Sequence, residues 1–432
     1  MSPQNSRLVA RLHAEVGEAV AERKGTAEGA GRGRMSSADE QALAYKLIAD
    51  RLADLADDAL QRGQEPLDPA AEKVLGQAVF DSLYGLGRIQ PLLDADPGYT
   101  DIHIAGCDSV WLTLPDGRKV RGEPVADSDE ELVDMIATAA RRLGRSERRW
   151  DYAHPELDMQ LANGDRLHAL MAVTSRPHVT IRRHRWTINR LYQLRELGMI
   201  DDRLEHFFGC AVKAGRNMII GGGTGTGKTT MMRCLVNEVD EDERIITVED
   251  SLELGLERFG DLHPDLVTLE ARAANIEGVG EFSMASLVRS GLRMNPKRCC
   301  VGEIRGKEVL PMLLAMSQGN DGSMCTVHAE SSQGVFGRLV MYAAMTEERF
   351  DPVVTNLLVA NAVHLVVHIG WADGRRCVTS VREVTGSDGQ QVITNEVFRP
   401  GPDGRAVPGY PLQEQTLARL EEVGFDRTVM ER

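Results

Sequence analysis

The sequence lacks three features that would place it in well-defined classes. Its longest apolar stretches, such as "VVTNLLVANAVHLVVHI" (353–369), are interrupted by polar residues and stay below the 18 or more apolar residues that predict a transmembrane helix. The N-terminus, "MSPQNSRLVARLHAEVGEA", has no apolar h-region, so no signal peptide is expected. The seven cysteines are scattered and form no C-x-x-C pair, which favours a thiol-reducing cytosol over a disulfide scaffold or a zinc site.

The chain also has too few basic residues for a typical nucleic-acid-binding protein. It carries 65 acidic residues against 50 Lys and Arg, a formal net charge of -15. Such a chain repels a phosphate backbone unless its basic residues cluster, so we expect no stable nucleic acid partner. Two basic clusters occur, at 141–149 ("RRLGRSERR") and 181–186 ("IRRHRW"). Each is either a solvated helix face or loop, or part of a subunit boundary or nucleotide edge.

What is present indicates an α/β protein of several domains. With 432 residues, 42% of them apolar, the chain can form two or three domains. We expect a helical segment over 1–74, with a flexible Gly-rich piece near 25–37 and a helix that Ser37 caps. A small α/β domain is expected over 75–185, with a hairpin around Asn163 and Gly164. An interdomain linker follows at 186–204.

The remaining residues, 205–432, alternate between strand and helix patterns. The apolar segments "RNMIIGG", "ERIITVED", "RCCVGEI" and "GSMCTVH" are predicted strands, each separated from the next by a helical pattern. This order predicts a parallel sheet with helices on its faces. From about residue 365 the turn signals predict an antiparallel extension.

A phosphate-binding loop lies between the first of these strands and its helix. Gly222-x-x-x-x-Gly227-Lys228-Thr229 satisfies the P-loop pattern, and the alternative, an ordinary Gly-rich turn, fits the flanking strand and helix less well. We expect Lys228 to reach the β- and γ-phosphates of ATP and Thr229 to ligate Mg²⁺. The expected nucleotide-binding residues are Gly222, Gly223, Thr224, Gly225, Thr226, Gly227, Lys228, Thr229 and Thr230. Kinases, GTPases, helicases and mechanical motors all carry such a loop.

Polar side chains follow the other predicted strands. In "VGEIRG", Glu303 is a candidate base for the attacking water and Arg305 a candidate for phosphate or carboxylate contact, unless Glu303 is a solvated strand end. We expected the Glu303 strand to lie beside the P-loop strand. Glu249 in "TVEDSLEL" is a second acidic candidate, or the cap of a following helix. His328 in "TVHAES" is a candidate γ-phosphate sensor, or a structural histidine.

Taken in order, these four segments resemble the Walker A, Asp-box, Walker B and His-box set of the type II/IV secretion ATPases. The segment 269–306 is similar to the branch that powers tight-adherence (Flp-type) pili, and the resemblance extends over about 84–400. It implies a RecA-like P-loop C-terminal domain, with Glu303 as catalytic base, Glu249 at the metal and water, and His328 at the γ-phosphate. It also implies that Arg166 and Arg182, in the smaller N-terminal domain, reach a nucleotide when the domains close.

The sequence departs from that family at two places. Glu330 stands where the His box commonly has Asn, and "DMQLANG" replaces a more usual Arg-bearing strand start. The branch with a four-cysteine zinc insert is excluded, because the chain has no such cysteines.

The resemblance implies a homohexameric ATP-driven motor for pilus assembly or protein secretion. We expect it to lie in the cytoplasm, peripheral to the inner face of the cell membrane, against an inner-membrane platform protein. Two alternatives stay open. The first is a DNA-handling P-loop translocase, which DNA-stimulated turnover would favour. The second is a nucleotide-binding scaffold with little turnover.

Overall fold

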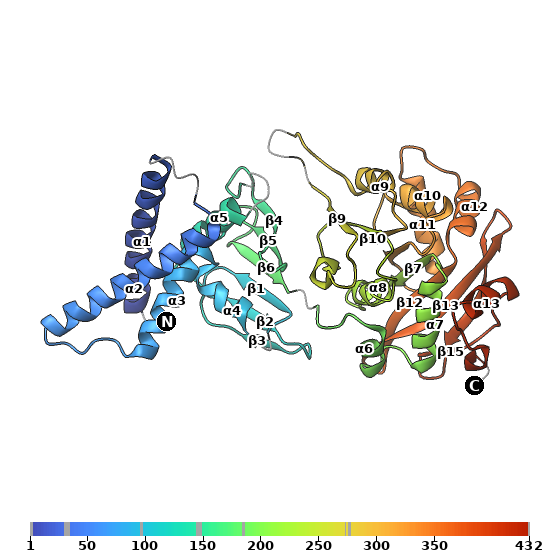
Figure 1. Cartoon of the computed structure of the whole chain (residues 1–432), viewed down its shortest axis with the longest axis horizontal. Helices are drawn as coiled ribbons and strands as arrows, with labels where there is room; N and C mark the ends of the chain where they lie inside the picture. Colours follow the sequence, from blue (N-terminus) through green and yellow to red (C-terminus); the bar gives the residue numbers. More distant parts are fainter. Residues whose placement is uncertain are drawn as a thin grey trace. The chain divides into compact units, whose positions relative to one another are not determined.

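The structure, a computed structural model, forms two compact units (Figure 1). It describes residues 3–29, 35–95, 98–143, 149–183, 186–272, 274 and 278–430. Unit 1 is Met1–His184 and unit 2 is Arg185–Arg432. Unit 1 therefore contains both the predicted helical segment and the predicted small α/β domain, and the four-part division expected from the sequence stays a prediction.

Three helices form the N-terminal part of unit 1. They are α1 (Pro3–Gly29), α2 (Ser37–Gln61) and α3 (Pro69–Tyr84). Their apolar faces bury a small core that includes Leu12, Val16, Ile48 and Val79. The residue that caps α2 is Ser36, whose hydroxyl accepts the Asp39 N–H at 3.2 Å, so the prediction of Ser37 was wrong by one residue.

The predicted flexible piece at 25–37 is partly helical. Helix α1 continues through Gly29, because the Gly-rich stretch begins with residues, such as Ala27 and Glu28, that favour a helix. Residues 30–34 lie outside the described residues, as do residues 144–148 of the first basic cluster and 184–185 of the second. Within the first cluster, Arg142 donates to the backbone carbonyls of Leu83 and Gly85 and so caps the end of α3.

The α/β part of unit 1 is a six-stranded antiparallel sheet in the order β3-β2-β1-β6-β5-β4. Alternate residues such as Ile102, Ile104, Leu167 and Ile181 are buried in its core, as period-two patterning predicts. The hairpin at Asn163-Gly164 joins β4 to β5 as expected. The elements are η1 (Gly87–Ile89), α4 (Gln90–Asp94), β1 (Asp101–Ala105), β2 (Val110–Thr113), β3 (Lys119–Arg121), α5 (Asp129–Leu143), β4 (Glu156–Gln160), β5 (Arg166–Leu170) and β6 (His178–Arg182).

Unit 2 contains a nine-stranded sheet in the order β15-β14-β13-β12-β7-β11-β10-β8-β9. Strands β12, β7, β11, β10, β8 and β9 run parallel, and β13 to β15 extend the sheet in antiparallel fashion. Its strands are β7 (Met218–Gly222), β8 (Ile245–Glu249), β9 (Leu266–Glu270), β10 (Arg298–Ile304), β11 (Met324–His328), β12 (Leu365–Ala372), β13 (Arg375–Ser387), β14 (Val392–Pro400) and β15 (Ala406–Pro408).

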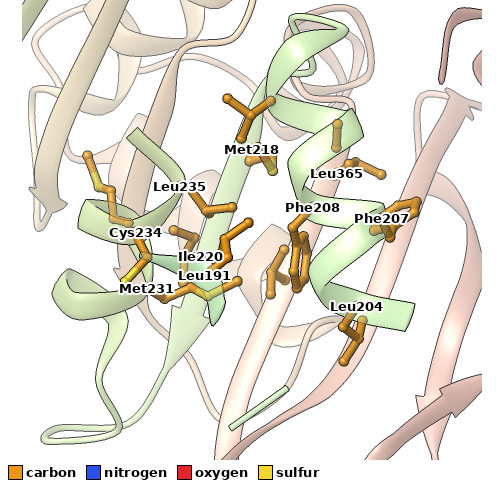
Figure 2. Packing of buried hydrophobic residues seen from close by; sticks show 14 of the residues in the cluster. Leu191, Leu204, Phe207, Phe208, Met218, Ile220, Met231, Cys234, Leu235 and Leu365 are labelled. Carbon is orange, nitrogen blue, oxygen red and sulfur yellow. The ribbon is translucent and has the colours of Figure 1, made fainter. Parts of the chain in front are cut away.

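Helices cover both faces of this sheet. On one face α6, α7, α8 and α13 pack against the strands, and Figure 2 shows Phe208 of α7 on the side of Ile220 of β7 and Leu235 of α8, with Phe207 on the opposite side of the helix. On the other face α9 to α12 form a second apolar layer. The helices are α6 (Leu191–Glu196), α7 (Asp202–Lys213), α8 (Lys228–Val236), η2 (Leu256–Phe259), α9 (Met284–Leu292), α10 (Val309–Ser317), α11 (Gly334–Ala344), α12 (Pro352–Ala362), α13 (Glu414–Glu421) and η3 (Arg427–Met430).

This architecture confirms the expected fold class. Unit 2 is a three-layer, RecA-like α/β domain in which the P-loop follows a central strand, and unit 1 combines a smaller α/β domain with a helical segment. Parallel central strands with helices on both faces bury their side chains completely, and all five residues of β7 are buried. Across the described part of the chain, no helix combines the length and the apolarity needed to cross a bilayer.

A buried asparagine fixes the start of the P-loop strand. Asn217 is fully buried, and its amide donates to the carbonyls of Met316 and Ala362 at 2.8 and 2.7 Å. Its side-chain oxygen accepts the N–H groups of Gly322 and Ser323 at 2.9 and 3.0 Å. One side chain thereby joins the start of β7 to the ends of α10 and α12 and to the turn before β11.

We expect Asn217→Ala to lower the free energy of unfolding of unit 2 by about 3 kcal/mol or more, because it leaves four buried backbone groups without partners. Urea unfolding measures this loss. Asn361→Ala is the matched control, since the exposed Asn361 amide donates only locally, to Leu357 O, and its loss should cost no more than about 0.5 kcal/mol. Equal effects of the two substitutions would contradict the assignment.

Candidate active site at the phosphate loop

The P-loop connects the end of β7 to the start of α8. The Thr226 hydroxyl donates to the Gly223 carbonyl at 3.0 Å and closes the turn. Gly225 and Gly227 have φ angles of 73° and 98°, in the left-handed region where a side chain would be strained. The loop therefore takes the compact form expected from its sequence, at a helix N-terminus whose partial positive charge favours anions.

Lys228 is the first residue of α8, and its side chain folds back over the loop. It is 7% exposed, and Nζ donates to the Gly223 carbonyl at 3.0 Å. Nζ also lies 3.4 Å from Nδ1 of His328. A largely buried ammonium group attracts an anion more strongly than an exposed one, so the residues present fit a bound phosphate chain.

The pairing of β11 with β7 determines the position of His328. The two strands are parallel, and His328 is paired directly with Gly222, the last residue of β7 and the first of the P-loop pattern. The Glu303 strand, β10, pairs with β11 and β8, so it lies one strand further from β7 than expected. The prediction that β10 adjoins the P-loop strand was wrong, because strand order depends on long-range packing that local patterns do not encode.

His328 connects Lys228 to Glu303. Its Nε2 is 2.8 Å from Oε1 of Glu303, while Nδ1 is the atom near Lys228. Burial lowers the pKa of His328 and the charges of Lys228 and Arg305 lower it further, whereas Glu303 acts in the opposite direction. The neutral tautomer that these partners select donates from Nε2 to Glu303 and accepts at Nδ1 from Lys228.

Arg305 holds the second oxygen of the same carboxylate. Its Nε donates to Oε2 of Glu303 at 2.6 Å, and its Nη1 lies 3.6 Å from Oδ2 of Asp250. The turn that carries it is fixed by Glu308, whose carboxylate accepts the N–H groups of Arg305 and Gly306. Local sequence patterns did not indicate Glu308, because it stands at the N-cap of α10 without a side-chain cap bond and glutamate is not among the preferred N-cap residues.

The structure places Glu249 at a nearby turn. It is 3% exposed, and its Oε2 accepts the N–H groups of Glu253 and Leu254, both at 2.9 Å. Its Cγ would lie 3.0 Å from a Cβ at position 302, so Gly302 leaves room for it. Glu249 therefore caps a turn, not the helix that the alternative expected, and a role for Glu249 at metal and water stays a prediction.

Arg166 and Arg182 lie in unit 1. They are direct cross-strand partners on β5 and β6, and Asp101 of β1 is paired with Arg182 on the other side. Like charges in a direct cross-strand pair repel each other, so an anion near them would be stabilising. Their approach to a nucleotide stays a prediction.

The glycine loop lies between a central parallel strand and its helix, which begins at Lys228. His328 and Glu303 lie at or near the ends of two other strands of the sheet. These features define a P-loop protein of the RecA-like class. The chain belongs to the family described as type II/IV secretion system protein, whose model matches residues 156–396.

Curated relatives agree with this assignment. A putative conjugal transfer protein of Mycobacterium tuberculosis is 35% identical over 323 residues, which cover 72% of this chain and 88% of the relative. The type IV secretion system protein VirB11 of Brucella suis is 34% identical over 169 residues, 38% of this chain and 46% of the relative.

Two solved structures also match. The VirB11 ATPase of Brucella suis, in complex with sulphate, is 25% identical, with a TM-score of 0.38 and coverage of 71% of this chain and 96% of that one. The Legionella pneumophila ATPase DotB is 19% identical, with a TM-score of 0.48 and coverage of 68% and 78%.

The buried position of Glu249 generates a prediction about pH. Burial raises its pKa from 4.5 to about 8, so between these values the folded protein keeps a proton that the unfolded chain releases. Stability therefore falls as pH rises through this interval. Wild-type protein should lose about 2 kcal/mol of its free energy of unfolding between pH 6 and pH 8 through this group. We expect Glu249→Gln, which keeps an acceptor oxygen, to remove that loss.

Urea midpoints at the two pH values measure this slope. Glu347→Gln serves as the control, because Glu347 is exposed and pairs with Lys307 on the surface, so its variant should keep the wild-type slope. A Glu249→Gln protein with the wild-type pH dependence would contradict the raised pKa.

Proposed function

We propose that this protein hydrolyses ATP with Mg²⁺ and uses the energy as a motor for pilus assembly or protein secretion. The observation that carries the proposal is the continuous contact from Lys228 through His328 to Glu303 at the mouth of the P-loop. It brings an ammonium group, an imidazole and a carboxylate together, which would supply a phosphate-binding cation, a γ-phosphate contact and a base for an ATPase.

Each of these residues has a defined part in the proposed reaction. Lys228 exchanges its contacts with Gly223 and His328 for oxygens of the β- and γ-phosphates. Glu303 accepts a proton from the attacking water as the new P–O bond forms, and the bond between the γ-phosphorus and the bridging oxygen breaks to release ADP. Both Nε and Nη2 of Arg305 contact Oε2 of Glu303, whereas Oε1 contacts only His328, so the second lone pair of Oε1 is the one that can accept the proton.

The remaining predicted residues would offset the negative charge of the triphosphate, either by holding Mg²⁺ or by supplying arginine side chains. Thr229, at the first turn of α8, would hold Mg²⁺, and Glu249 is a second candidate. Mg²⁺ bound there would neutralise charge on the phosphate oxygens. Arg305 orients Glu303 through their ion pair, and Arg166 and Arg182 would supply always-charged donors from the other unit.

We further propose that the protein works as a homohexamer against an inner-membrane platform protein, peripheral to the cytoplasmic face of the membrane, and belongs to the tight-adherence branch. The family membership and the resemblance of 269–306 support this. The division of the chain into two compact units suits a motor whose parts move with phosphate occupancy.

We expect Glu303→Gln to lower kcat by about 100-fold or more while ATP still binds, because the amide cannot accept the proton. Lys228→Ala should instead weaken ATP binding by about tenfold or more, since it removes a phosphate contact. Steady-state phosphate release and equilibrium binding of a fluorescent ATP analogue separate the two effects.

The exposed carboxylate variant Glu347→Gln should turn over at the wild-type rate. Unchanged turnover in both Glu303→Gln and Lys228→Ala would show that this site does not hydrolyse ATP. It would favour a nucleotide-binding scaffold, or a different active site.

A second candidate, a DNA-handling translocase, is favoured by the conjugal-transfer name of the Mycobacterium tuberculosis relative. The net charge of -15 argues against it. We expect single- and double-stranded DNA to change ATP turnover by less than about twofold at 150 mM salt. Strong stimulation that disappears as salt is raised would overturn the secretion assignment in favour of DNA transfer.

A further inference from the structure

A buried arginine on the P-loop helix has no part in the site described above. Arg233 lies five residues after Lys228 on α8 and is 3% exposed. Its guanidinium donates to three backbone carbonyls: Nε to Leu254 at 2.6 Å, Nη2 to Glu253 at 2.8 Å and Nη1 to Ile188 at 3.3 Å. These acceptors come from two segments that are distant in sequence both from α8 and from each other.

The first segment is the turn that holds Glu249. The N–H groups of Glu253 and Leu254 donate to Glu249, and the carbonyls of the same two residues accept from Arg233. The carbonyl groups of this turn therefore bind Arg233, and the amide groups of the same turn bind Glu249. The peptide unit between Glu253 and Leu254 carries both a donor to Glu249 and an acceptor of Arg233, so it connects α8 directly to the Glu249 carboxylate.

The second segment, 186–190, is the chain that enters unit 2 from unit 1. Besides the Ile188 contact, Asn237 just after α8 donates from its side-chain amide to the Asn189 carbonyl at 2.8 Å. Arg190 in turn donates to the Asn237 carbonyl. The entering segment is thus bound to the P-loop helix at three consecutive residues.

Trp186 adds a contact between the two segments. The Arg258 guanidinium lies 3.8 Å from the centre of the Trp186 ring, and Arg258 belongs to η2, directly after the Glu249 turn. Gly255 has a φ of 61°, and a Cβ there would come within 2.2 Å of the indole nitrogen, so the ring packs directly on the turn backbone. The entering segment, the Glu249 turn and α8 form one continuous cluster.

Burial of this cation is costly, and burial lowers the pKa of Arg233. An apolar side chain would fill the same position at lower cost, but it would leave three carbonyls without donors and the segments unconnected. Arginine is suited to this position because its planar donor group can bind several acceptors at once.

We propose that Arg233 is a positioning residue that couples the P-loop helix both to Glu249 and to segment 186–190. The inference rests on the proposed function, since it requires a nucleotide at the P-loop. Nucleotide binding at the N-terminus of α8 moves or stiffens this helix. Arg233 and Asn237 pass the change to the segment that leads to unit 1.

Backbone hydrogen exchange of the full chain tests the coupling, with and without Mg²⁺ and a non-hydrolysable ATP analogue. In the wild type we expect the analogue to protect the P-loop amides and also those of 186–190. Arg233→Lys keeps the charge but loses the three-way contact. It should bind the analogue with P-loop protection intact, lose most of the protection at 186–190, and lower kcat about tenfold with KM changed less than about threefold.

Arg298→Lys is the matched control, because Arg298 is equally buried in unit 2 but pairs with Glu243 and the Val212 carbonyl. It should keep the protection at 186–190. Should Arg233→Lys fail to fold, Asn237→Ala tests the same coupling through Asn189, and it should lower protection at 186–190 without affecting the Glu249 turn.

The outcomes separate the inference from the proposed function. Wild-type protein with no nucleotide protection at the P-loop would overturn the proposed function, and the coupling with it. P-loop protection without protection at 186–190 would overturn the coupling alone. Full wild-type protection at 186–190 in Arg233→Lys, or in Asn237→Ala if the first variant does not fold, would also overturn it.

Discussion

The parallel pairing of β11 with β7 is the constraint on which the site depends. It sets His328 beside Gly222, and from there the imidazole contacts Lys228 on one side and Glu303 on the other. A shift of β11 by one residue would point His328 to the opposite face of the sheet and separate the lysine from the glutamate. Central parallel strands that are buried on both faces give this register the rigidity that a preorganised site requires.

The site is also arranged by its charges. A neutral histidine separates a buried lysine from a glutamate that Arg305 holds, while Glu249 nearby has a raised pKa. In the proposed function, a triphosphate would replace the contacts that Lys228 makes with Gly223 and His328. The cluster around Arg233 extends this polar organisation from the P-loop helix into segment 186–190. The P-loop at one end of α8 and segment 186–190 at the other are thereby physically connected.

Local signals in the sequence were sufficient for the P-loop, the strands that precede Glu249, Glu303 and His328, and the hairpin at Asn163-Gly164. Each of these depends on a short motif, an apolar run or a turn dipeptide. The strand order, with β11 between β7 and β10, was not predictable because it depends on long-range packing. The same holds for Arg233, whose partners lie about 20 and 45 residues away. The Ser36 cap shows how a boundary between two adjacent serines escapes pattern analysis.

The most direct test of this account is a crystal structure of unit 2 within the full chain, with Mg²⁺ and a non-hydrolysable ATP analogue bound. The account predicts that Nζ of Lys228 leaves the Gly223 carbonyl for the β- and γ-phosphates, with His328 at the γ-phosphate and Glu303 facing the water in line with the bond to be broken. A triphosphate bound at the P-loop with His328 and Glu303 both turned away from its terminal phosphate would contradict it.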